Sequence, residues 1–484
     1  MMIAQQIVYS RIAAIARELA ETVVRTARSR GLAEGRCFAT ALLTGAPRVV
    51  AQVQHDANHI YLVRSSVAAL LDYFAFDLAD GDVVVVGDPF SGGSTPQCLT
   101  LALPVFHDGA LRLFPAVRAE LADLAGEFPG ALHPLATETW QEAIRVTPVK
   151  LYCAGTLQRD VLRFLLRNSR AEALVRSDLE AIVAALRNAA SSVSALLRDR
   201  GRTAIEQAVE AAIVHGRRLA RASIARFPQG ERSAARVLHQ PEISPITVRA
   251  TVCVGRDELA IHFGGSSAAT RQPFNMTSGH ARSFAYVAAF ASLLSEAVLN
   301  EGMLDVLGVM VPAGSLLDAK LPAATGLAPV ATGHLVASAV GDALFGAAAP
   351  AYRTDGPVPL MVAYQPIGST ANNPPLPLAP GFALAAQGWG APILAGSAIL
   401  PSAEIAETRD GFAMLARERD AAGQIRARVR NLLGALEANV FVPNGEIRLH
   451  AEGASRELAS GVAIRVPAGA ELDFIYPAYG EPME

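Results

Sequence analysis

The sequence predicts a mixed α/β fold with several lobes, in which mixed sheets are combined with long helices. The chain has 484 residues, which is too long for one small core and indicates roughly two or three packed subdomains. Residues 81–119 contain short apolar runs separated by turn residues, as buried strands do. Residues 157–221 are rich in Ala, Leu and Arg at helical spacing. Both patterns in one chain favour a mixed class.

The first predicted element is an amphipathic helix of about 25 residues at the N-terminus. Gly31 ends its pattern of apolar residues, which recur at helical spacing at Ile12, Ile15, Leu19 and Val23. Residues 48–54 then alternate between apolar and polar side chains, as a strand does. Residues 81–93 (GDVVVVGDPFSGG) are typical of a buried strand that runs into a glycine-rich turn.

A hairpin and a long helical region follow. Residues 99–119 are interpreted as two strands joined at His107-Asp108-Gly109, because Asp-Gly is a strong hairpin signal. The helical region of residues 157–221 has one break, at Gly201. The polar stretch 227–245 is predicted to be a connector and the main subdomain boundary.

The second half of the chain returns to mixed patterns. We expect a hairpin at residues 246–265, a buried helix at 281–300 and a loop-rich region at 312–400. Short alternating runs from residue 409 onward predict strands. The predicted units are an N-terminal α/β lobe, a second α/β lobe and a C-terminal β-rich unit, at residues 1–226, 246–400 and 401–484.

The composition points toward a chain that buries much apolar surface. Hydrophobic residues make up 51% and charged residues 18% of the sequence, and no apolar run has the length of a membrane span. We therefore expect a large subunit interface, because exposed apolar area on a monomer favours aggregation. The net charge of −3 gives no support for nucleic acid or an anionic membrane as a partner.

The cysteines and the N-terminus predict a cytoplasmic location. The four cysteines form no CxxC pair, which argues against both a disulfide framework and a cysteine-rich zinc site. The N-terminal segment has Arg and Glu within its apolar pattern, unlike a signal peptide.

Several motifs occur in order along the chain, and together they resemble the hydantoinase B/oxoprolinase family. This family includes the B-type subunits of ATP-dependent hydantoinases, the C-terminal part of 5-oxoprolinases and the matching subunit of acetone and acetophenone carboxylases. The resemblance implies a multi-lobed hydantoinase B-like fold. The motifs are GDVVVVGDPFSGGSTPQ (81–97), LPVFHDGALRLF (103–114), RAELADLAGEFPGAL (118–132), HFGGSS (262–267) and ALFGAAAP (343–350).

The resemblance also implies a family metal site that this chain has altered. The family pattern approximates DPYxGGxHxxD followed by an RAH-type segment, and its His and Asp side chains suit a zinc- or manganese-like ion. Thr95, Cys98 and Glu120 stand at the His, Asp and second His positions. We therefore predict that the divalent metal has been lost, and we assign no metal ligand. A rebuilt site of Cys98 and Glu120, with Asp123 or His59, is the alternative.

Other candidate residues have a functional and a structural interpretation. Asp88 either orients a ligand or caps the glycine-rich turn, and His59 either faces the pocket or is a hydrogen-bonded core residue. Asn275 is a ligand contact or a turn former. His262, which replaces an acid of the family, is a candidate general base together with Glu120. The predicted catalytic residues are Asp88, Glu120, His59, Asp123 and His262, and the predicted substrate-binding residues are Thr95, Cys98 and Asn275.

The resemblance implies a two-step chemistry shared between subunits. An A-type, actin-like ATPase partner would hold ATP and Mg²⁺ and phosphorylate an unreactive carbonyl, and this chain contains no Walker A sequence. The B-type subunit, alone or with a second B-type copy or a small subunit in a hetero-oligomer, would then process the activated substrate. The first hypothesis is a cyclic-amide hydrolase for hydantoin, oxoproline or other lactams. The alternatives are a ketone carboxylase subunit and a non-catalytic scaffold.

Overall fold

The structure is a computed structural model that describes twelve segments of the chain. These are residues 3–53, 55, 59–127, 133–239, 244–293, 298–346, 360–366, 407–408, 412–419, 425–441, 445–459 and 462–476.

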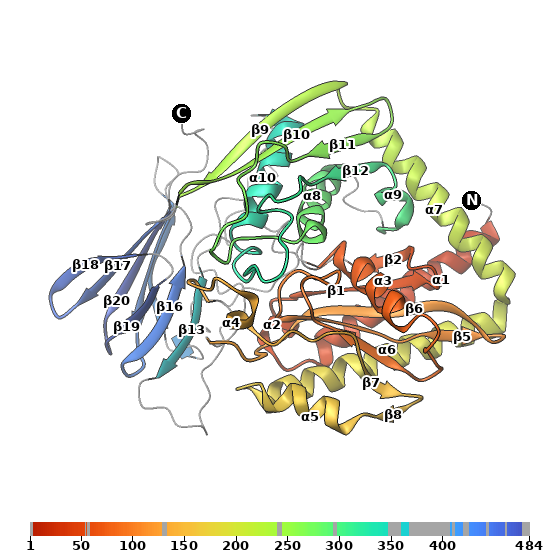
Figure 1. Cartoon of the computed structure of the whole chain (residues 1–484), viewed down its shortest axis with the longest axis horizontal. Coiled ribbons are helices and arrows are strands. Elements are labelled where there is room, and N and C mark those ends of the chain that lie inside the picture. Colours follow the sequence, from red (N-terminus) through yellow and green to blue (C-terminus); the bar gives the residue numbers. More distant parts are fainter. Residues whose placement is uncertain are drawn as a thin grey trace.

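The largest sheet has eight strands and forms the centre of the N-terminal part (Figure 1). Its strand order is β2-β1-β6-β4-β3-β7-β8, and β5 pairs with β6. The strands are β1 (Phe38–Thr44), β2 (Val49–Val53), β3 (Val83–Val86), β4 (Cys98–Ala102), β5 (Val105–His107), β6 (Ala110–Glu120), β7 (Val149–Cys153) and β8 (Thr156–Leu157).

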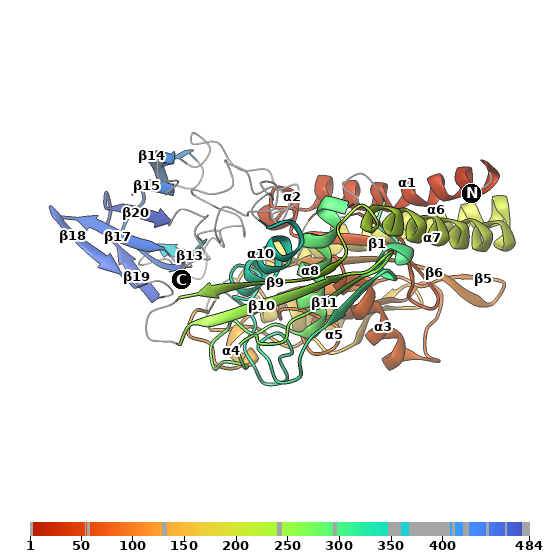
Figure 2. The same ribbon diagram turned by 90° about the horizontal axis from the view of Figure 1, so that it is seen from above.

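Helices cover both faces of this sheet. On one face α1 packs against α6, α7, β1 and β2, and the three helices run side by side in Figure 2. On the other face α3 packs against β1, β3, β4 and β6. The helices of this part are α1 (Ile3–Thr26), α2 (Arg30–Ala33), α3 (Leu62–Phe74), α4 (Thr139–Glu142), α5 (Arg159–Arg167), α6 (Glu172–Arg200) and α7 (Arg202–Ile224).

The strands of the first sheet contribute to two different cores because successive side chains point to opposite faces. In β1, Phe38 and Leu42 join the core formed with α1 and α6. Ala41 and Leu43 join the other core, which also contains residues of α3, α8 and the second sheet. The side of the sheet that faces α3 and α8 is therefore buried as deeply as the side that faces the long helices.

A second sheet has four strands in the order β12-β11-β10-β9. Helix α10 packs against β9 and β10, and α8 packs against α10, so one face of this sheet is covered. Figure 1 shows this layer above the first sheet. The elements are β9 (Gly230–Leu238), β10 (Ile246–Val254), β11 (Leu259–His262), β12 (Leu307–Met310), α8 (Ser278–Leu293), α9 (Glu301–Leu304) and α10 (Thr332–Phe345).

Two further sheets lie in the C-terminal part, with orders β13-β16-β19 and β14-β15-β20-β17-β18. They extend away from the other layers in Figures 1 and 2. Their strands are β13 (Leu360–Pro366), β14 (Phe412–Arg419), β15 (Ile425–Asn431), β16 (Leu436–Phe441), β17 (Glu446–Ala451), β18 (Ala454–Leu458), β19 (Val462–Val466) and β20 (Glu471–Tyr476).

Most predicted elements are confirmed, including the mixed α/β class. The opening helix is α1, the break in the helical region falls at Gly201 with φ +76°, and the turn at Asp108 and Gly109 has positive φ at both residues. The strand predicted before that turn is divided into β4 and β5. The division into three lobes stays a prediction.

Two predictions about the second half need correction. The stretch 227–245 is not merely a connector, because β9 occupies much of it and pairs with β10 along its whole length. Its polar residues mark an edge strand with one solvent-facing side. The region 312–400 was predicted to be rich in loops, but it contains the helix α10. This helix is apolar on all sides, so its sequence shows no helical period. Residues 347–359 and 367–400 lie outside the described residues.

No helix in the described part of the chain is both long enough and apolar enough to span a bilayer.

Candidate active site

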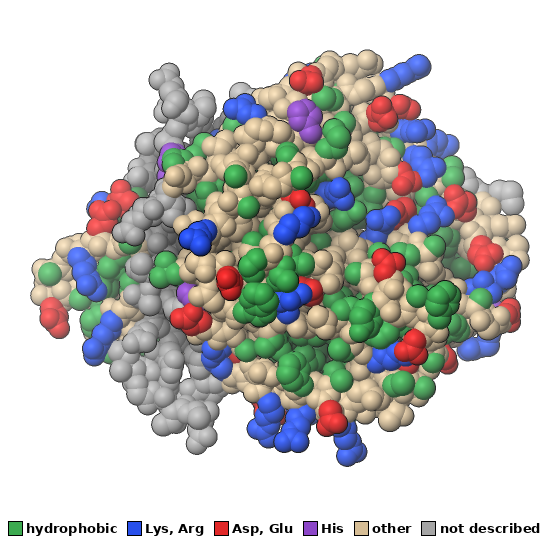
Figure 3. All heavy atoms as spheres, viewed as in Figure 1, with side chains coloured by type: hydrophobic (Ala, Val, Ile, Leu, Met, Phe, Trp, Pro, Cys, Tyr) green, Lys and Arg blue, Asp and Glu red, His purple; other side chains and the backbone are tan. Residues whose placement is uncertain are grey.

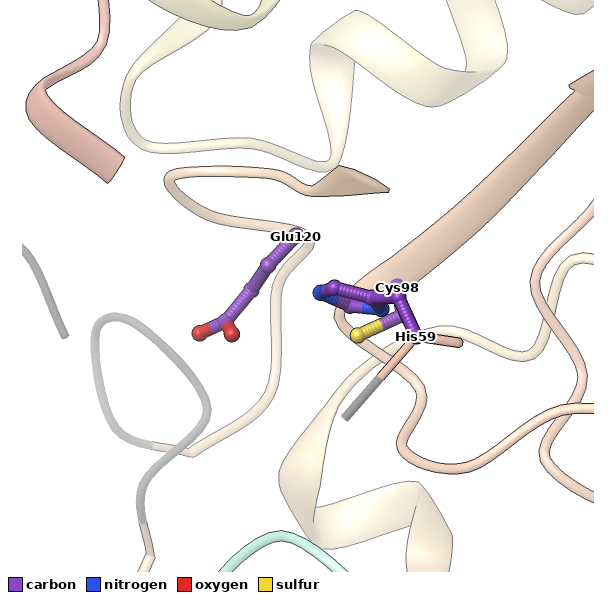
Figure 4. A group of neighbouring side chains, drawn as sticks. All are labelled: His59, Cys98 and Glu120. Atoms are coloured by element: carbon purple, nitrogen blue, oxygen red, sulfur yellow. The ribbon is translucent and has the colours of Figure 1, made fainter. Parts of the chain in front are cut away.

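Cys98 and Glu120 are brought together by the pairing of β4 with β6. These residues are direct partners in the antiparallel ladder, which places their side chains on the same face of the sheet. His59 lies in the turn just before α3, on that same side. The nitrogen, sulfur and oxygen ligand atoms of His59, Cys98 and Glu120 all lie within 4.8 Å of one another (Figure 4). We call these three residues the buried cluster.

The glycine-rich turn after β3 packs tightly on α3. A Cβ at Gly92, which has φ +75°, would lie 2.4 Å from the Ser65 carbonyl oxygen. The hydroxyls of Ser65 and Ser66 donate to the Gly92 carbonyl at 2.7 and 2.9 Å. Thr277 donates to the Gly93 carbonyl at 2.6 Å from the other side. Only glycine fits here, so the sequence motif encodes a close backbone approach.

Asp88 begins this turn and is ion-paired with Arg145. The guanidinium donates to both carboxylate oxygens, at 3.1 and 2.9 Å, and Ser91 donates at 2.8 Å. Burial raises the pKa of Asp88, but the bonds from Arg145, Ser91 and the Phe90 backbone outweigh it and hold the pKa below its ordinary value. These contacts give Asp88 the turn-fixing role that the sequence left open beside ligand binding.

Arg118 lies two residues before Glu120 on β6, and it was not predicted from the sequence as a site residue. Its side chain is 1% exposed, and its guanidinium donates to the hydroxyls of Ser94 at 2.8 Å and Thr100 at 3.0 Å. The signal was present, because Arg118 follows the apolar run Leu113–Val117 and shares the face of Glu120 by the two-residue period.

His280 on α8 is the second missed residue. It is fully buried, its ring lies 5.3 Å from that of Phe284, and neither ring nitrogen has a hydrogen-bond partner among the described residues. The buried Gln97 amide is likewise unpartnered among them. Buried polar atoms without protein partners mark a place where water or a ligand can bind. No local pattern around His280 distinguishes it from a core histidine.

Burial and Arg118 determine the charge state of the site. Burial lowers the pKa of His280 to about 3, and the Arg118 charge acts in the same direction. Burial also places the pKa of His59 well below its ordinary value, with Arg118 and His280 adding to the shift. Burial raises the pKa of Cys98 to about 12, although Arg118 opposes this. At neutral pH the site therefore combines neutral imidazoles and a neutral thiol with one guanidinium.

Comparison with known proteins identifies the family. The sequence matches hydantoinase B/oxoprolinase over residues 1–422. The chain belongs to this family. The resemblance carried by the ordered motifs is thereby confirmed.

Three relatives match the hydantoinase B chain over about two thirds of its length. The chain is 27% identical over 316 residues to the beta subunit of caprolactamase from Pseudomonas jessenii, covering 63% of this chain and 53% of that one. It is 24% identical over 361 residues to a putative D-/L-hydantoinase B-type subunit of Pseudomonas sp. (strain NS671), covering 70% and 60%. It is 26% identical over 339 residues to 5-oxoprolinase 1 of Arabidopsis thaliana, covering 65% and 27%. The match thus spans 27% to 60% of these relatives.

Two solved structures share the hydantoinase B fold. The ATP-dependent caprolactamase from Pseudomonas jessenii superposes with a TM-score of 0.85 at 22% identity, covering 98% of this chain and 90% of that chain. Acetone carboxylase in its nucleotide-free state superposes with a TM-score of 0.80 at 15% identity, covering 98% and 75%.

The side chains of the buried cluster bear on whether this chain could bind a divalent metal at the family position. An imidazole, a thiol and a carboxylate lie within 4.8 Å of one another, and once the thiol has lost its proton these are the donor types of a zinc site with one open position. Thr95 Oγ1 lies 3.2 Å from Cys98 Sγ and adds a weak oxygen donor. The donor set therefore fits a thiophilic divalent cation, through His59 rather than Asp123. That the family metal has been lost stays a prediction.

The remaining predicted residues lie apart from the buried cluster. Asp123 is ion-paired with Arg170 at 3.0 Å and accepts from the Arg170 backbone at 2.6 Å. Asn275 bonds with the backbone of Thr270, Gln272 and Ala324, as a turn former does. His262 lies on β11 of the second sheet, in a different group of side chains. The structure thus unites His59, Thr95, Cys98 and Glu120 only.

Proposed function

We propose that this chain is a B-type subunit of an ATP-dependent complex that hydrolyses a cyclic amide. The buried cluster beside Arg118 is the observation that carries the proposal, since a carboxylate, two neutral imidazoles and a guanidinium lie in one group. The names of the relatives, a caprolactamase subunit, a hydantoinase subunit and 5-oxoprolinases, support a lactam, hydantoin or oxoproline ring as the substrate class.

The residues of the cluster suit the second step of such a reaction. Once the carbonyl oxygen of a lactam is phosphorylated, water adds to the carbon and Glu120 takes a proton from that water. The ring C–N bond breaks as the nitrogen leaves protonated, and a second water converts the acyl phosphate into carboxylate and phosphate. Arg118 offers a fixed positive charge for the developing anion. In the alternative of a rebuilt metal site, His59, Cys98 and Glu120 would hold a divalent cation that polarises the reacting oxygen, and Glu120 would then be a ligand rather than the base.

The nucleotide is assigned to a partner subunit. The similar proteins include an ATP-dependent caprolactamase and proteins that are themselves subunits. We infer an actin-like, A-type ATPase as that partner, holding ATP and Mg²⁺, with this chain in a hetero-oligomer. Large apolar side chains that reach the surface support such docking, and Figure 3 shows hydrophobic groups between the charged ones on one face. Exposed examples are Ile3, Ile7, Phe76, Trp140, Phe164 and Val214.

The proposal is tested by reconstitution with the A-type subunit from the same genome. We expect co-purification and ATP-dependent opening of caprolactam, 5-oxoproline or a hydantoin, with ADP and the ring-opened acid formed together. Glu120→Gln is expected to lower kcat by about 100-fold or more, the usual size of a general-base effect. The matched control is Glu457→Gln, which changes an exposed carboxylate on β18, outside the buried cluster.

Three outcomes distinguish the hypotheses. Ring opening that disappears in Glu120→Gln supports the hydrolase. Turnover of acetone or acetophenone with bicarbonate and ATP, but not of lactams, would replace it with the carboxylase function, which the acetone carboxylase fold also accommodates. A complex whose activity is unchanged in Glu120→Gln would leave only the scaffold function, which the three altered family ligands favour.

A further inference from the structure

A second group of His, Cys and Glu side chains lies on the second sheet. Glu231 on β9 is the direct antiparallel partner of Cys253 on β10. His262 on β11 pairs with Thr251, two residues from Cys253 along β10. Because side chains two residues apart share a face, all three project from the same side of the sheet. We call Glu231, Cys253 and His262 the surface cluster.

The surface cluster is compact and lies on the side opposite α10. Its ligand atoms all lie within 4.8 Å of one another, and Cys253 Sγ is 3.3 Å from Glu231 Oε2. Glu231 is exposed, and Cys253 and His262 are half-buried. The apolar residues Val252 and Ile261 alternate with them and point into the core. The sheet therefore fixes the three backbones and leaves the ligand atoms accessible to solvent.

We propose that the surface cluster is a binding site for a thiophilic divalent cation such as Zn²⁺, with one coordination position open to water. The donor types carry this proposal, since one thiolate, one imidazole and one carboxylate are the ligands that zinc uses most. Three donors on neighbouring strands are already close, so binding requires only side-chain rotation. Cys253 loses its proton to solvent on binding, as a thiol ligand must. The site does not depend on the proposed amide hydrolysis.

The experiment is a Co²⁺ and Zn²⁺ titration of the full chain after treatment with a chelator. Tetrahedral Co²⁺ bound through a thiolate gives a sulfur-to-cobalt charge-transfer absorption, which reports ligation by cysteine and is independent of any enzyme activity. We expect this band in the wild-type chain and its loss when Zn²⁺ is added. Cys253→Ser should abolish the part of the charge-transfer band that comes from the surface cluster. His262→Gln should weaken the affinity for Co²⁺ by about 100-fold or more, which exceeds the usual effect of changing a residue that only supports a metal ligand.

Two cysteine variants act as matched controls. Cys153→Ser changes an exposed thiol outside both clusters, and Cys98→Ser removes the thiol of the buried cluster. If both clusters bind metal, the variants Cys98→Ser and Cys253→Ser should each bind one equivalent of Co²⁺ fewer than the wild-type chain. The proposal is overturned if the wild-type chain gives no charge-transfer band, or if Cys253→Ser keeps the full wild-type band and stoichiometry. Should that variant misfold by circular dichroism, a wild-type affinity in His262→Gln overturns it equally.

Discussion

The buried cluster and the surface cluster contain the same three residue types in different surroundings. Each is built on a Cys–Glu pair directly opposed in an antiparallel ladder, with a histidine added from a third segment. The buried cluster lies beneath α3 and beside a buried guanidinium, whereas the surface cluster lies on the open face of a sheet. The ligand types are thus set by sheet register, and the chemistry available to them is set by burial.

Electrostatics separates the two clusters further. Burial and the Arg118 charge keep His59 neutral by lowering its pKa, and burial raises the pKa of Cys98 to about 12. At Cys253 burial also raises the thiol pKa, and the neighbouring Glu231 adds to this. Both thiols lie beside a carboxylate that raises the thiol pKa, Glu120 or Glu231, but only Cys98 also lies beside a cation, Arg118, which opposes that rise. The guanidinium therefore favours anionic substrates at the buried cluster, and the surface cluster has no such cation among the groups that shift its thiol pKa.

The largest expected effect comes from removing Arg118, the cation beside the buried cluster. Arg118→Met should lower the free energy of unfolding by about 3 kcal/mol, because the hydroxyls of Ser94 and Thr100 lose their charged donor in a buried site. Urea denaturation followed by circular dichroism measures this change. The matched variant Arg249→Met removes an exposed arginine from β10, and it should change stability by less than about 0.5 kcal/mol. Equal effects of the two variants would refute the electrostatic contrast.

The next effect is a dependence of stability on pH to which His280, beside the buried cluster, contributes. The pKa of His280 is about 3 in the folded chain, against an ordinary value near 6.5. Its neutral form therefore stabilises the fold fully above about pH 6.5, and this contribution is lost as the pH falls toward 3. Urea denaturation at pH 7 and pH 5 should give a slope of at most about 1.4 kcal/mol per pH unit from this residue.

The variant His280→Gln tests how much of the pH dependence of stability comes from His280. The variant should show a shallower loss of stability between pH 7 and pH 5 than the wild-type chain does. Phe284→Leu alters the packing beside His280 but keeps the imidazole, so its pH slope should match the wild-type slope. If His280→Gln leaves the slope unchanged, His280 is not buried in its neutral form.

The fold was predictable from sequence where periodicity was strong. The helix α1, the glycine break before α7 and the Asp108-Gly109 turn follow from local signals. The strand β9 was missed because an edge strand with one solvent-facing side has the composition of a linker. The helix α10 was missed because glycine and alanine on an entirely buried helix leave no polar face to reveal the period.

The site was only partly predictable, since spatial neighbours come from register rather than from spacing. The family pattern pointed to Thr95, Cys98 and Glu120, and the β4–β6 ladder joins the last two. Asp123 is close to Glu120 in sequence, yet it bonds to Arg170 instead. His280 lies 182 positions after Cys98 in the sequence. Only tertiary packing brings α8 to the first sheet, and no short-range motif encodes that contact.

The smallest expected effects compare the two cysteines directly. Cys98 is 0% exposed, so Cys98→Ser should lower the free energy of unfolding by about 1 kcal/mol, whereas Cys253→Ser should change it by less than about 0.5 kcal/mol.

A chromogenic thiol reagent should react quickly with the native chain only at Cys153 and Cys253, because Cys37 and Cys98 are buried. Cys253→Ser should therefore remove one fast-reacting thiol and Cys98→Ser none. Fast labelling of Cys98 in the native chain would mean that solvent reaches the buried cluster, and the distinction between an enclosed cationic site and an open metal-binding one would then fail.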